Sequence, residues 1–235
     1  MLIGGLEKLT LIDYPNEIAA IVFTQGCNFR CGFCYNPMLV LPSKDGNKKG
    51  HSLLPEDDLF NFLKNRKGKL DGVVITGGEP TLHKDLPEFT RKIRDLGFKV
   101  KLDTNGTNPK MLAALLEEGL IDYIAMDIKA PLEKYKATTK FKGDLADIEK
   151  SVKIIMNGNL PYEFRTTVVP ALLDKNDIEK MGEMIKGARI WYLQRFKPDT
   201  DLINGDLRKI MPYSDKELNE MREIGAKYVK KCIVR

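Results

Sequence analysis

The feature that most limits the possible folds is a regular alternation of apolar, strand-like segments with segments of helical periodicity. Such an alternation is typical of a parallel sheet whose strands are joined by helical crossovers. The predicted strands cover residues 18–23, 72–75, 98–102, 123–126, 162–169 and 190–193. The predicted helices, with their caps, cover 55–68, 85–97, 108–119, 144–157 and 175–186, and a final helix begins at Ser214.

Capping residues support several of these helix boundaries. Asp85 and Glu88 have the spacing of a capping box, and so do Ser214 and Glu217. Asn108 stands as a cap directly before a proline, which favours a helix start at that point.

The number of strand–helix units predicts the fold class. A closed TIM barrel has eight such units, so six predict a partial (β/α)6 TIM-like barrel within a single α/β domain. Residues 1–17 are predicted to form a short N-terminal extension, extended or hairpin in structure. Residues 18–196 form the predicted core, and 197–235 add a loop and a helix. A hydrophobic content of 43% is sufficient for such a core.

Charge and hydropathy exclude other classes of partner. The net charge is +5, and no basic stripe with interleaved aromatic residues is present, so no nucleic-acid binding is predicted. No apolar run is long enough to span a bilayer, and the N-terminus lacks the pattern of a signal peptide, so no membrane association is predicted. We expect a cytoplasmic protein, because that compartment keeps cysteines reduced.

Three of the four cysteines follow the first predicted strand directly. Cys27, Cys31 and Cys34 have the spacing C-x₃-C-x₂-C, which is typical of ligands for a soft metal centre. The fourth, Cys232, is predicted to pack as a small apolar residue on the last helix. Structural zinc sites and [4Fe–4S] clusters both normally take four protein ligands. A structural zinc site would lack its fourth ligand here, whereas an open position is where a catalytic metal site binds its substrate or cofactor. The three cysteines therefore predict a [4Fe–4S] cluster with one open iron, and zinc is the alternative.

A polar or glycine-rich segment follows each predicted strand. The carboxyl ends of barrel strands meet at one face and build the active site there. These segments are the cysteine loop and the motifs TGGEP, DTNG, MDIK, RTTVVP and LQRF. We therefore expect them to share one rim. The longer segment 39–54 is predicted to be a loop, and loops of that length are often functional.

The cysteine motif, with Phe33 before its last cysteine, resembles the signature of the radical S-adenosylmethionine (radical SAM) enzymes. The resemblance implies a [4Fe–4S] cluster whose open iron binds the amino and carboxylate groups of SAM. It also implies an oxidoreductase in which one electron splits SAM into methionine and a 5′-deoxyadenosyl radical, which abstracts a hydrogen atom.

Two further motifs extend the resemblance. Gly77, Gly78 and Glu79 resemble the GGE motif of the family, whose backbone contacts the methionyl amino group, although an ordinary turn is the alternative. DTNG and MDIK resemble segments of glycyl-radical-enzyme activases, some of which hold a monovalent cation there. This implies cation ligands at Asp103, Thr104, Ala125 and Asp127. Two ordinary strand-end aspartates are the alternative.

Positive charge is predicted on the same rim. Lys129 and Arg165 could pair with the SAM carboxylate, or form ion pairs with Asp127 or Glu163. Phe196 stands where some activases carry a histidine near the ribose. The predicted SAM contacts are Phe33, Tyr35, Gly77, Gly78, Glu79, Asp103, Asn105, Asp127, Ile128, Lys129, Arg165, Val168, Gln194 and Phe196.

Together, the motifs are similar to those of the activating enzymes of anaerobic ribonucleotide reductase and of pyruvate formate-lyase. The resemblance implies a glycyl-radical enzyme as partner, most closely anaerobic ribonucleotide reductase, and a flavodoxin- or ferredoxin-type electron donor. Two alternatives are a radical SAM enzyme that acts on a small molecule, and a non-catalytic Fe–S or zinc-binding module.

Overall fold

A computed structural model describes residues 1–40 and 52–235 of the chain. The middle of the predicted 39–54 loop lies outside the described residues. The chain divides into two compact units. The first comprises Met1–Asn28, Met38–Thr104 and Asn108–Ile124, and the second comprises Phe29–Pro37, Asn105–Thr107 and Ala125–Arg235.

The strands follow one another in sequence order in one open sheet. Strand β1 pairs antiparallel with β2, while the pairs β2–β3, β3–β4, β6–β7 and β7–β8 are parallel. The strands are β1 (Ile3–Thr10), β2 (Ala19–Thr24), β3 (Gly72–Gly77), β4 (Lys99–Thr104), β5 (Tyr123–Asp127), β6 (Tyr162–Val168), β7 (Trp191–Arg195) and β8 (Cys232–Val234). This order confirms the predicted partial TIM-like barrel, in which β2 to β7 are the six predicted strands.

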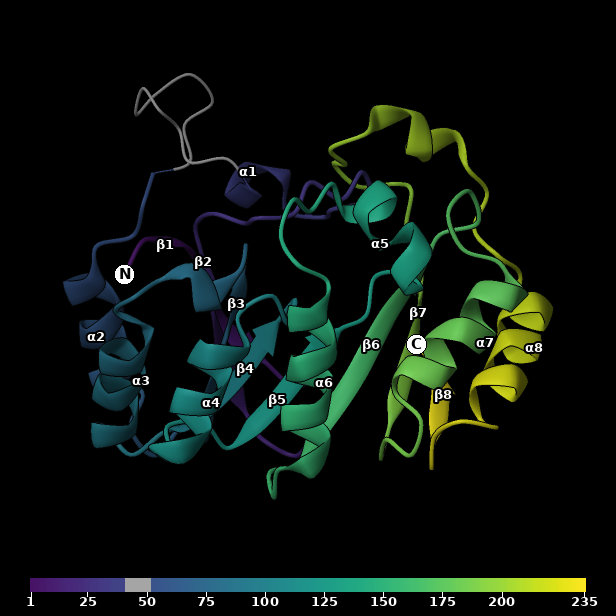
Figure 1. Ribbon diagram of the computed structural model, residues 1–235. Coiled ribbons are helices and arrows are strands. Elements are labelled where there is room, and N and C mark those ends of the chain that lie inside the picture. The colour runs from purple at the N-terminus through teal and green to yellow at the C-terminus, as the bar shows by residue number, and fades with distance from the viewer. Residues whose placement is uncertain (41–51) are drawn as a thin grey trace. The chain divides into compact units, whose positions relative to one another are not determined.

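Helices separate most of the parallel strands. The helices are α1 (Pro37–Val40), α2 (Glu56–Lys64), α3 (Leu86–Asp95), α4 (Pro109–Glu117), α5 (Leu132–Thr139), α6 (Ala146–Asn157), α7 (Lys175–Met184) and α8 (Asp215–Gly225), with 3₁₀ turns η1 (Pro80–Leu82) and η2 (Gly205–Lys209). In the first unit, α2, α3 and α4 lie along one side of the strands (Figure 1). In the second, α7 and α8 lie side by side (Figure 1). No described helix is both long and apolar enough to cross a membrane.

The N-terminal segment is extended, as predicted, whereas the C-terminal end differs from the prediction. The N-terminal extension is a full strand, β1, which pairs with β2 from Ile3–Thr24 to Thr10–Ala19, with register shifts between Ile3 and Gly5 and between Glu7 and Thr10. The expectation that Cys232 lies on the last helix is wrong, because α8 ends at Gly225 and Cys232 begins β8. A strand of three residues is too short to produce a periodic pattern, which explains why the sequence did not reveal it.

The helix caps give a mixed result. Ser214 and Glu217 form the predicted capping box, and the Asn108 side chain accepts a hydrogen bond from the Met111 N–H. The capping box predicted at Asp85 is wrong, because its side chain makes no cap hydrogen bond. Its carboxylate instead pairs with the amino group of Met1 at 2.6 Å. Asp85 therefore forms an ion pair with a residue far away in the sequence and does not cap the helix that follows it.

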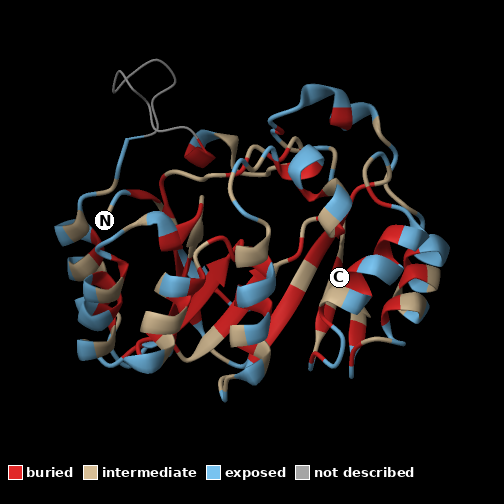
Figure 2. Cartoon of the chain, viewed as in Figure 1, coloured by how far each residue is buried: buried red, intermediate tan, exposed pale blue. Residues whose placement is uncertain are grey.

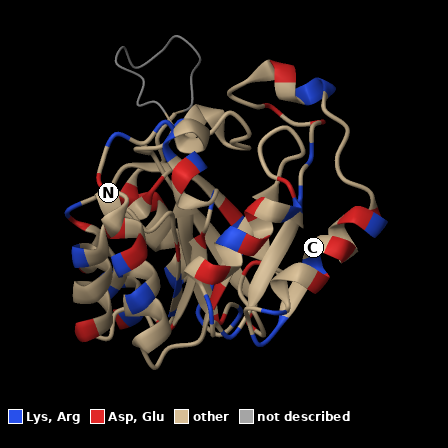
Figure 3. Ribbon diagram, turned by 45° about the vertical axis from the view of Figure 1, so that its right-hand side comes forward, with Lys and Arg blue, Asp and Glu red and all other residues tan. Residues whose placement is uncertain are grey.

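Burial follows the sheet. Most strand residues are buried, while the helices present exposed outer surfaces (Figure 2). In β3, Val73, Val74 and Ile75 are completely buried, as expected of parallel strands covered on both faces. In the second unit the largest buried side chain is Trp191, whose indole N–H donates to the Thr166 hydroxyl at 3.0 Å. Charges of both signs are interspersed over the helices (Figure 3).

Candidate functional site

The first part of the cysteine loop belongs to the first unit. Strand β2 ends at Thr24, and Gly26 then adopts a φ of 98°, which glycine tolerates and other residues rarely do. The Gly26 N–H donates to the Leu39 carbonyl oxygen at 2.6 Å. The chain therefore turns sharply just before Cys27, whose side chain is partly exposed.

The GGE motif packs directly against this turn. The Gly78 N–H donates to the Thr24 carbonyl at 2.8 Å, and the Glu79 N–H donates to the Gly26 carbonyl at 2.7 Å. A Cβ on Gly78 would lie 1.9 Å from the Gly26 carbonyl oxygen. Gly77 has a φ of 116°. Both glycines are thus required by the contact between two backbones, which positions the cysteine loop.

The Glu79 side chain joins the ends of two strands. It is 1% exposed, and its Oε1 accepts hydrogen bonds from the Thr81 N–H (3.1 Å) and hydroxyl (2.6 Å). The same oxygen accepts a bond from the Thr104 hydroxyl at 2.7 Å. Thr104 ends β4, so this carboxylate fixes the end of β4 to the GGE turn. The sequence did not predict this role for Glu79.

His83, four residues after Glu79 in the sequence, contacts the same turn. Its Nε2 lies 3.0 Å from the carbonyl oxygen of Gln25, the residue before Gly26. Burial lowers the pKa of His83, which favours the neutral ring, and the Nε2–H tautomer can donate to that carbonyl. His83 therefore acts as a structural residue of the loop.

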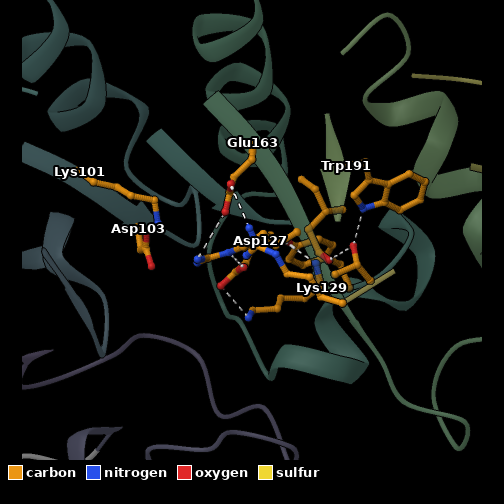
Figure 4. Close-up of polar contacts among 11 residues, drawn as sticks. Lys101, Asp103, Asp127, Lys129, Glu163 and Trp191 are labelled. Carbon is orange, nitrogen blue, oxygen red and sulfur yellow. Dashed lines mark hydrogen bonds and ion pairs between the residues drawn. The ribbon is translucent and has the colours of Figure 1, made fainter. Parts of the chain in front are cut away.

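A buried ion pair lies on β4. Lys101 and Asp103 are two residues apart in the strand, so their side chains share one face of the sheet. The Lys101 Nζ lies 2.6 Å from the Asp103 Oδ1, and the lysine is only 1% exposed (Figure 4). The ammonium also lies 5.8 Å from the centre of the Tyr123 ring. Lys101 was not among the predicted site residues, although its spacing from Asp103 was a visible signal.

The rest of the cysteine loop belongs to the second unit. The Cys34 N–H donates to the Cys31 carbonyl at 3.1 Å, which makes a tight turn between these two thiols. Phe33 within that turn is buried. The Lys129 ammonium lies 5.9 Å from the centre of its ring. Cys31 is buried and Cys34 is partly exposed.

Two distant segments anchor this part of the loop. The Arg30 N–H donates to the carbonyl of Thr139, the last residue of α5, at 2.7 Å. From the segment after β7, the Asn204 N–H donates to the Gly32 carbonyl at 2.9 Å. The Lys197 N–H of the same segment donates to the Tyr35 hydroxyl at 2.8 Å. Neither anchor was predicted, because α5 has weak amphipathic character and the later segment is irregular.

Asp127 pairs with two cations. The Lys129 Nζ lies 3.0 Å from one carboxylate oxygen, and the Arg165 Nε lies 2.9 Å from the other (Figure 4). Burial by itself would raise the pKa of Asp127, but the charges of Arg165 and Lys129 outweigh it and hold that pKa well below its usual range. Burial likewise opposes the charge of Lys129, yet Asp127 keeps the pKa of this lysine raised. Lys129 and Arg165 were expected either to pair with the SAM carboxylate or to form ion pairs within the protein. The structure contains the ion pairs with Asp127.

Glu163 adds a second carboxylate to this network. It is 1% exposed, and its oxygens lie 4.0 Å from the Arg165 guanidinium and 3.8 Å from that of Arg235. The Arg235 guanidinium also stacks 3.8 Å above the Tyr192 ring. The second unit thus presents alternating acidic and basic groups along neighbouring strands.

A comparison with protein families identifies the chain. Residues 21–186, which contain the cysteine loop and strands β3 to β6, match the model of the radical SAM superfamily. The chain belongs to the radical SAM superfamily. It is therefore an enzyme of the class that uses a [4Fe–4S] cluster and SAM.

Similar curated proteins extend over the whole chain. A protein of Methanocaldococcus jannaschii, whose name provisionally assigns it to the glycyl-radical enzyme activating enzymes, is 36% identical over 100% of this chain and 95% of its own length. A second protein of that organism with the same kind of name is 31% identical over 96% of this chain and 83% of its own. The pyruvate formate-lyase-activating enzyme of Clostridium pasteurianum is 27% identical over 96% and 87%.

Solved structures show the same fold at low identity. SuiB of Streptococcus suis, in a crystal structure with bound S-adenosylmethionine, has a TM-score of 0.65 and 17% identity over 90% of this chain. This radical SAM chain spans 48% of the length of SuiB. TYW1 with a bound lysine-pyruvate adduct has a TM-score of 0.58 and 14% identity, covering 89% of this chain and 73% of that one.

The donor set fits the radical SAM cluster. Cys27, Cys31 and Cys34 form no disulfide bond, and thiolates are the ligands that [4Fe–4S] clusters prefer. Among the described residues, no three cysteine, histidine or acidic side chains already converge on one point, so the assignment rests on the spacing and the family. The fourth cysteine, Cys232, is buried on β8, and burial raises its pKa to about 11.

The remaining predicted radical SAM contacts differ in accessibility. Asn105 accepts hydrogen bonds from the N–H and hydroxyl of Thr107, so it shapes the turn after β4. Val168 and Phe196 are fully buried, whereas Gln194 is partly exposed. The N–H of Ile128 donates to the Arg165 carbonyl at 2.9 Å, which ties the segment after β5 to β6.

Proposed function

We propose that this protein is a glycyl-radical enzyme activase, which removes a hydrogen atom from one glycine of a larger partner enzyme. The observation that carries this proposal is the full-length similarity to the M. jannaschii protein named for that activity. A [4Fe–4S] cluster held by Cys27, Cys31 and Cys34 would supply one electron for the cleavage of SAM to methionine and a 5′-deoxyadenosyl radical, and this radical would take the glycine hydrogen. The partner keeps the unpaired electron, and 5′-deoxyadenosine leaves.

Different residues of this chain are proposed to bind the cluster and SAM. Cys27, Cys31 and Cys34 would hold the cluster through their thiolates. The backbone of Gly77-Gly78-Glu79 receives the methionyl amino group. The further proposed SAM contacts are Phe33, Tyr35, Asp103, Asn105, Asp127, Ile128, Val168, Gln194 and Phe196.

Lys129 and Arg165 provide the positive charge for the SAM carboxylate. They already converge on the carboxylate of Asp127 in the second unit. A second carboxylate could share them, because a guanidinium has five N–H donors and an ammonium has three. Their pre-existing pairing also keeps both side chains ordered, which lowers the entropy lost on binding.

We further propose that the partner is an anaerobic ribonucleotide reductase and that a flavodoxin- or ferredoxin-type protein donates the electron. The motifs TQGCNFRCGFCYNP and DTNGTNP support this choice within the activases. The three thiols of the cysteine loop, which form no disulfide bond, suit the reducing, anaerobic cytoplasm in which such a partner works.

Anaerobic reconstitution tests the proposal. The cluster-containing protein is mixed with SAM, a chemical reductant and candidate glycyl-radical enzymes, and electron paramagnetic resonance is recorded together with 5′-deoxyadenosine release. We expect a glycyl doublet with the reductase. SAM cleavage without a doublet in any candidate would favour the alternative of a small-molecule substrate. Absence of cleavage in iron-loaded protein would favour a non-catalytic module.

A cysteine pair provides the matched control. Cys27→Ala should lose cluster binding and SAM cleavage together, since the cluster retains only two ligands. Cys232→Ala removes the same side chain from a strand that carries no proposed ligand, and should keep both. Retention of cleavage by Cys27→Ala would contradict the ligand assignment.

A further inference from the structure

Asp103 on β4 and Asp127 on β5 each have their own protein cation. In the first unit, the carboxylate of Asp103 lies 2.6 Å from the ammonium of Lys101. In the second unit, the carboxylate of Asp127 is in contact with both Lys129 and Arg165. The resemblance to activases implied that these two aspartates hold a monovalent metal cation, and their observed contacts do not fit that ion.

The mismatch is one of charge. The charge of Asp103 is balanced by Lys101. The charge of Asp127 is balanced by Lys129 and Arg165, the second of which also pairs with Glu163. A metal cation added beside either aspartate would approach an ammonium or guanidinium at close range, where like charges repel strongly in a partly buried site. A carboxylate whose charge is already balanced attracts such an ion only weakly.

Lys101 is well suited to replace an ion. An ammonium carries one positive charge and three donors, so it can satisfy carboxylate oxygens as a small monovalent cation would. It is attached to the strand that carries Asp103, so it needs no binding equilibrium. Its near-complete burial, beside the Tyr123 ring, holds the charge in one place. A buried charge of this kind is retained where it has a partner.

We propose that Lys101 is a tethered substitute for a monovalent metal cation at Asp103, and that neither Asp103 nor Asp127 binds such an ion in this protein. The consequence for SAM rests on the proposed function: SAM binding should need no added sodium or potassium. The statement about the ion itself is independent of that function.

Thermal unfolding tests the ion directly. The cluster-containing protein is unfolded in potassium chloride and in tetramethylammonium chloride at equal ionic strength, because the large organic cation cannot enter a small oxygen site. We expect the same Tm in both salts for the wild-type protein. Lys101→Met should unfold at lower temperature, and potassium should restore roughly 3 °C or more.

Three variants make the result specific. Lys227→Met changes an exposed lysine in the same way and should show no dependence on the salt. Lys101→Arg keeps the charge and should also be indifferent to potassium. Lys101→Met combined with Asp103→Asn removes both charges, so potassium should have no effect even if Lys101→Met alone fails to fold.

Direct ion binding and SAM binding complete the experiment. Thallium-205 resonance reports on monovalent sites, and we expect no bound thallium in the wild-type protein. The Kd for SAM should agree within about twofold between the two salts, a difference well below 1 kcal/mol. One equivalent of bound thallium, or a wild-type Tm that rises with potassium, overturns the proposal. If SAM binds in neither salt, the proposed function fails, while the unfolding and thallium results still decide on Lys101.

Discussion

The contacts around the candidate site differ in emphasis between the two units, although the first also contains the Lys101–Asp103 ion pair and the second also anchors its part of the cysteine loop by backbone hydrogen bonds. In the first unit, backbone hydrogen bonds and glycine contacts join the GGE turn to the cysteine loop, and Glu79 accepts bonds from threonines. In the second unit, charged side chains on neighbouring strands hold one another, with Asp127 between two cations. Backbone packing tolerates no added atom, whereas a network of charges can lose one member and keep its shape. The first unit should therefore be rigid and the second adjustable.

The largest effect should come from Gly78→Ala. Its Cβ would lie 1.9 Å from the Gly26 carbonyl oxygen, so one of the two backbones must move. We expect a loss of about 3 kcal/mol or more in the free energy of unfolding, together with loss of iron from the reconstituted protein. Urea unfolding and iron analysis measure both.

Gly205→Ala is the matched control, since a Cβ there meets no atom within 4 Å. Its unfolding and iron content should equal those of the wild-type protein. Equal iron binding by Gly78→Ala would show that the first unit is less rigid than the comparison holds.

A smaller effect is expected when a charge is removed from the second unit. Arg165→Met leaves Asp127 with Lys129 alone, and should cost about 2 kcal/mol at neutral pH. The depressed pKa of Asp127 stabilises the fold above the ordinary aspartate pKa, near 4, and this stabilisation is lost as the pH falls through the folded-state value. The difference in stability between wild-type protein and Asp127→Asn should therefore shrink below about pH 4.

Denaturant unfolding from pH 7 down to pH 3 gives this profile. Glu220→Gln, which removes an exposed partner of Lys175, should leave stability nearly unchanged at every pH, because solvent screens exposed ion pairs. A pH-independent cost for Asp127→Asn would mean that the ion pairs contribute nothing, and the contrast between the units would fail.

A hydroxyl deletion tests the first unit more gently. Thr104→Val removes one donor to the buried Glu79 carboxylate at constant size, and should cost about 1–2 kcal/mol. Thr104→Ser keeps the hydroxyl and should lose much less. If the two variants prove equally stable in urea, Glu79 does not link the two strand ends.

The smallest effect concerns reactivity. Burial raises the pKa of Cys232 to about 11, so only about 0.1% of it is thiolate at pH 8. In protein stripped of its cluster, iodoacetamide should label Cys27 and Cys34, which are partly exposed, well before Cys232. Mass spectrometry of the peptides gives the rates. Labelling of Cys232 as fast as Cys27 would show that β8 opens readily.

The success of the sequence interpretation was uneven for a physical reason. Six strands were predicted within a few residues. Residues 18–23 and 72–75 are continuous apolar runs, as expected of strands buried on both faces, and the others follow from the alternation with helical segments. The caps at Asn108 and Ser214 were correct because they depend on neighbours three residues away. The cap at Asp85 failed because its carboxylate pairs with Met1, far away in the chain. Helix α5 and strand β8 left too weak a pattern to detect.

The amino-acid order alone determined the strand–helix alternation, the three-cysteine motif and the positions of polar motifs after strands, since each depends on spacing along a few residues. Tertiary structure alone decided which group each charged side chain meets. Glu79 bonds to Thr104 across 25 residues, and Arg165 reaches Asp127 across 38. Lys101 is close to Asp103 in the sequence, yet only the buried setting makes its ammonium a candidate replacement for an ion. Long-range partners follow from packing, and no local pattern encodes them.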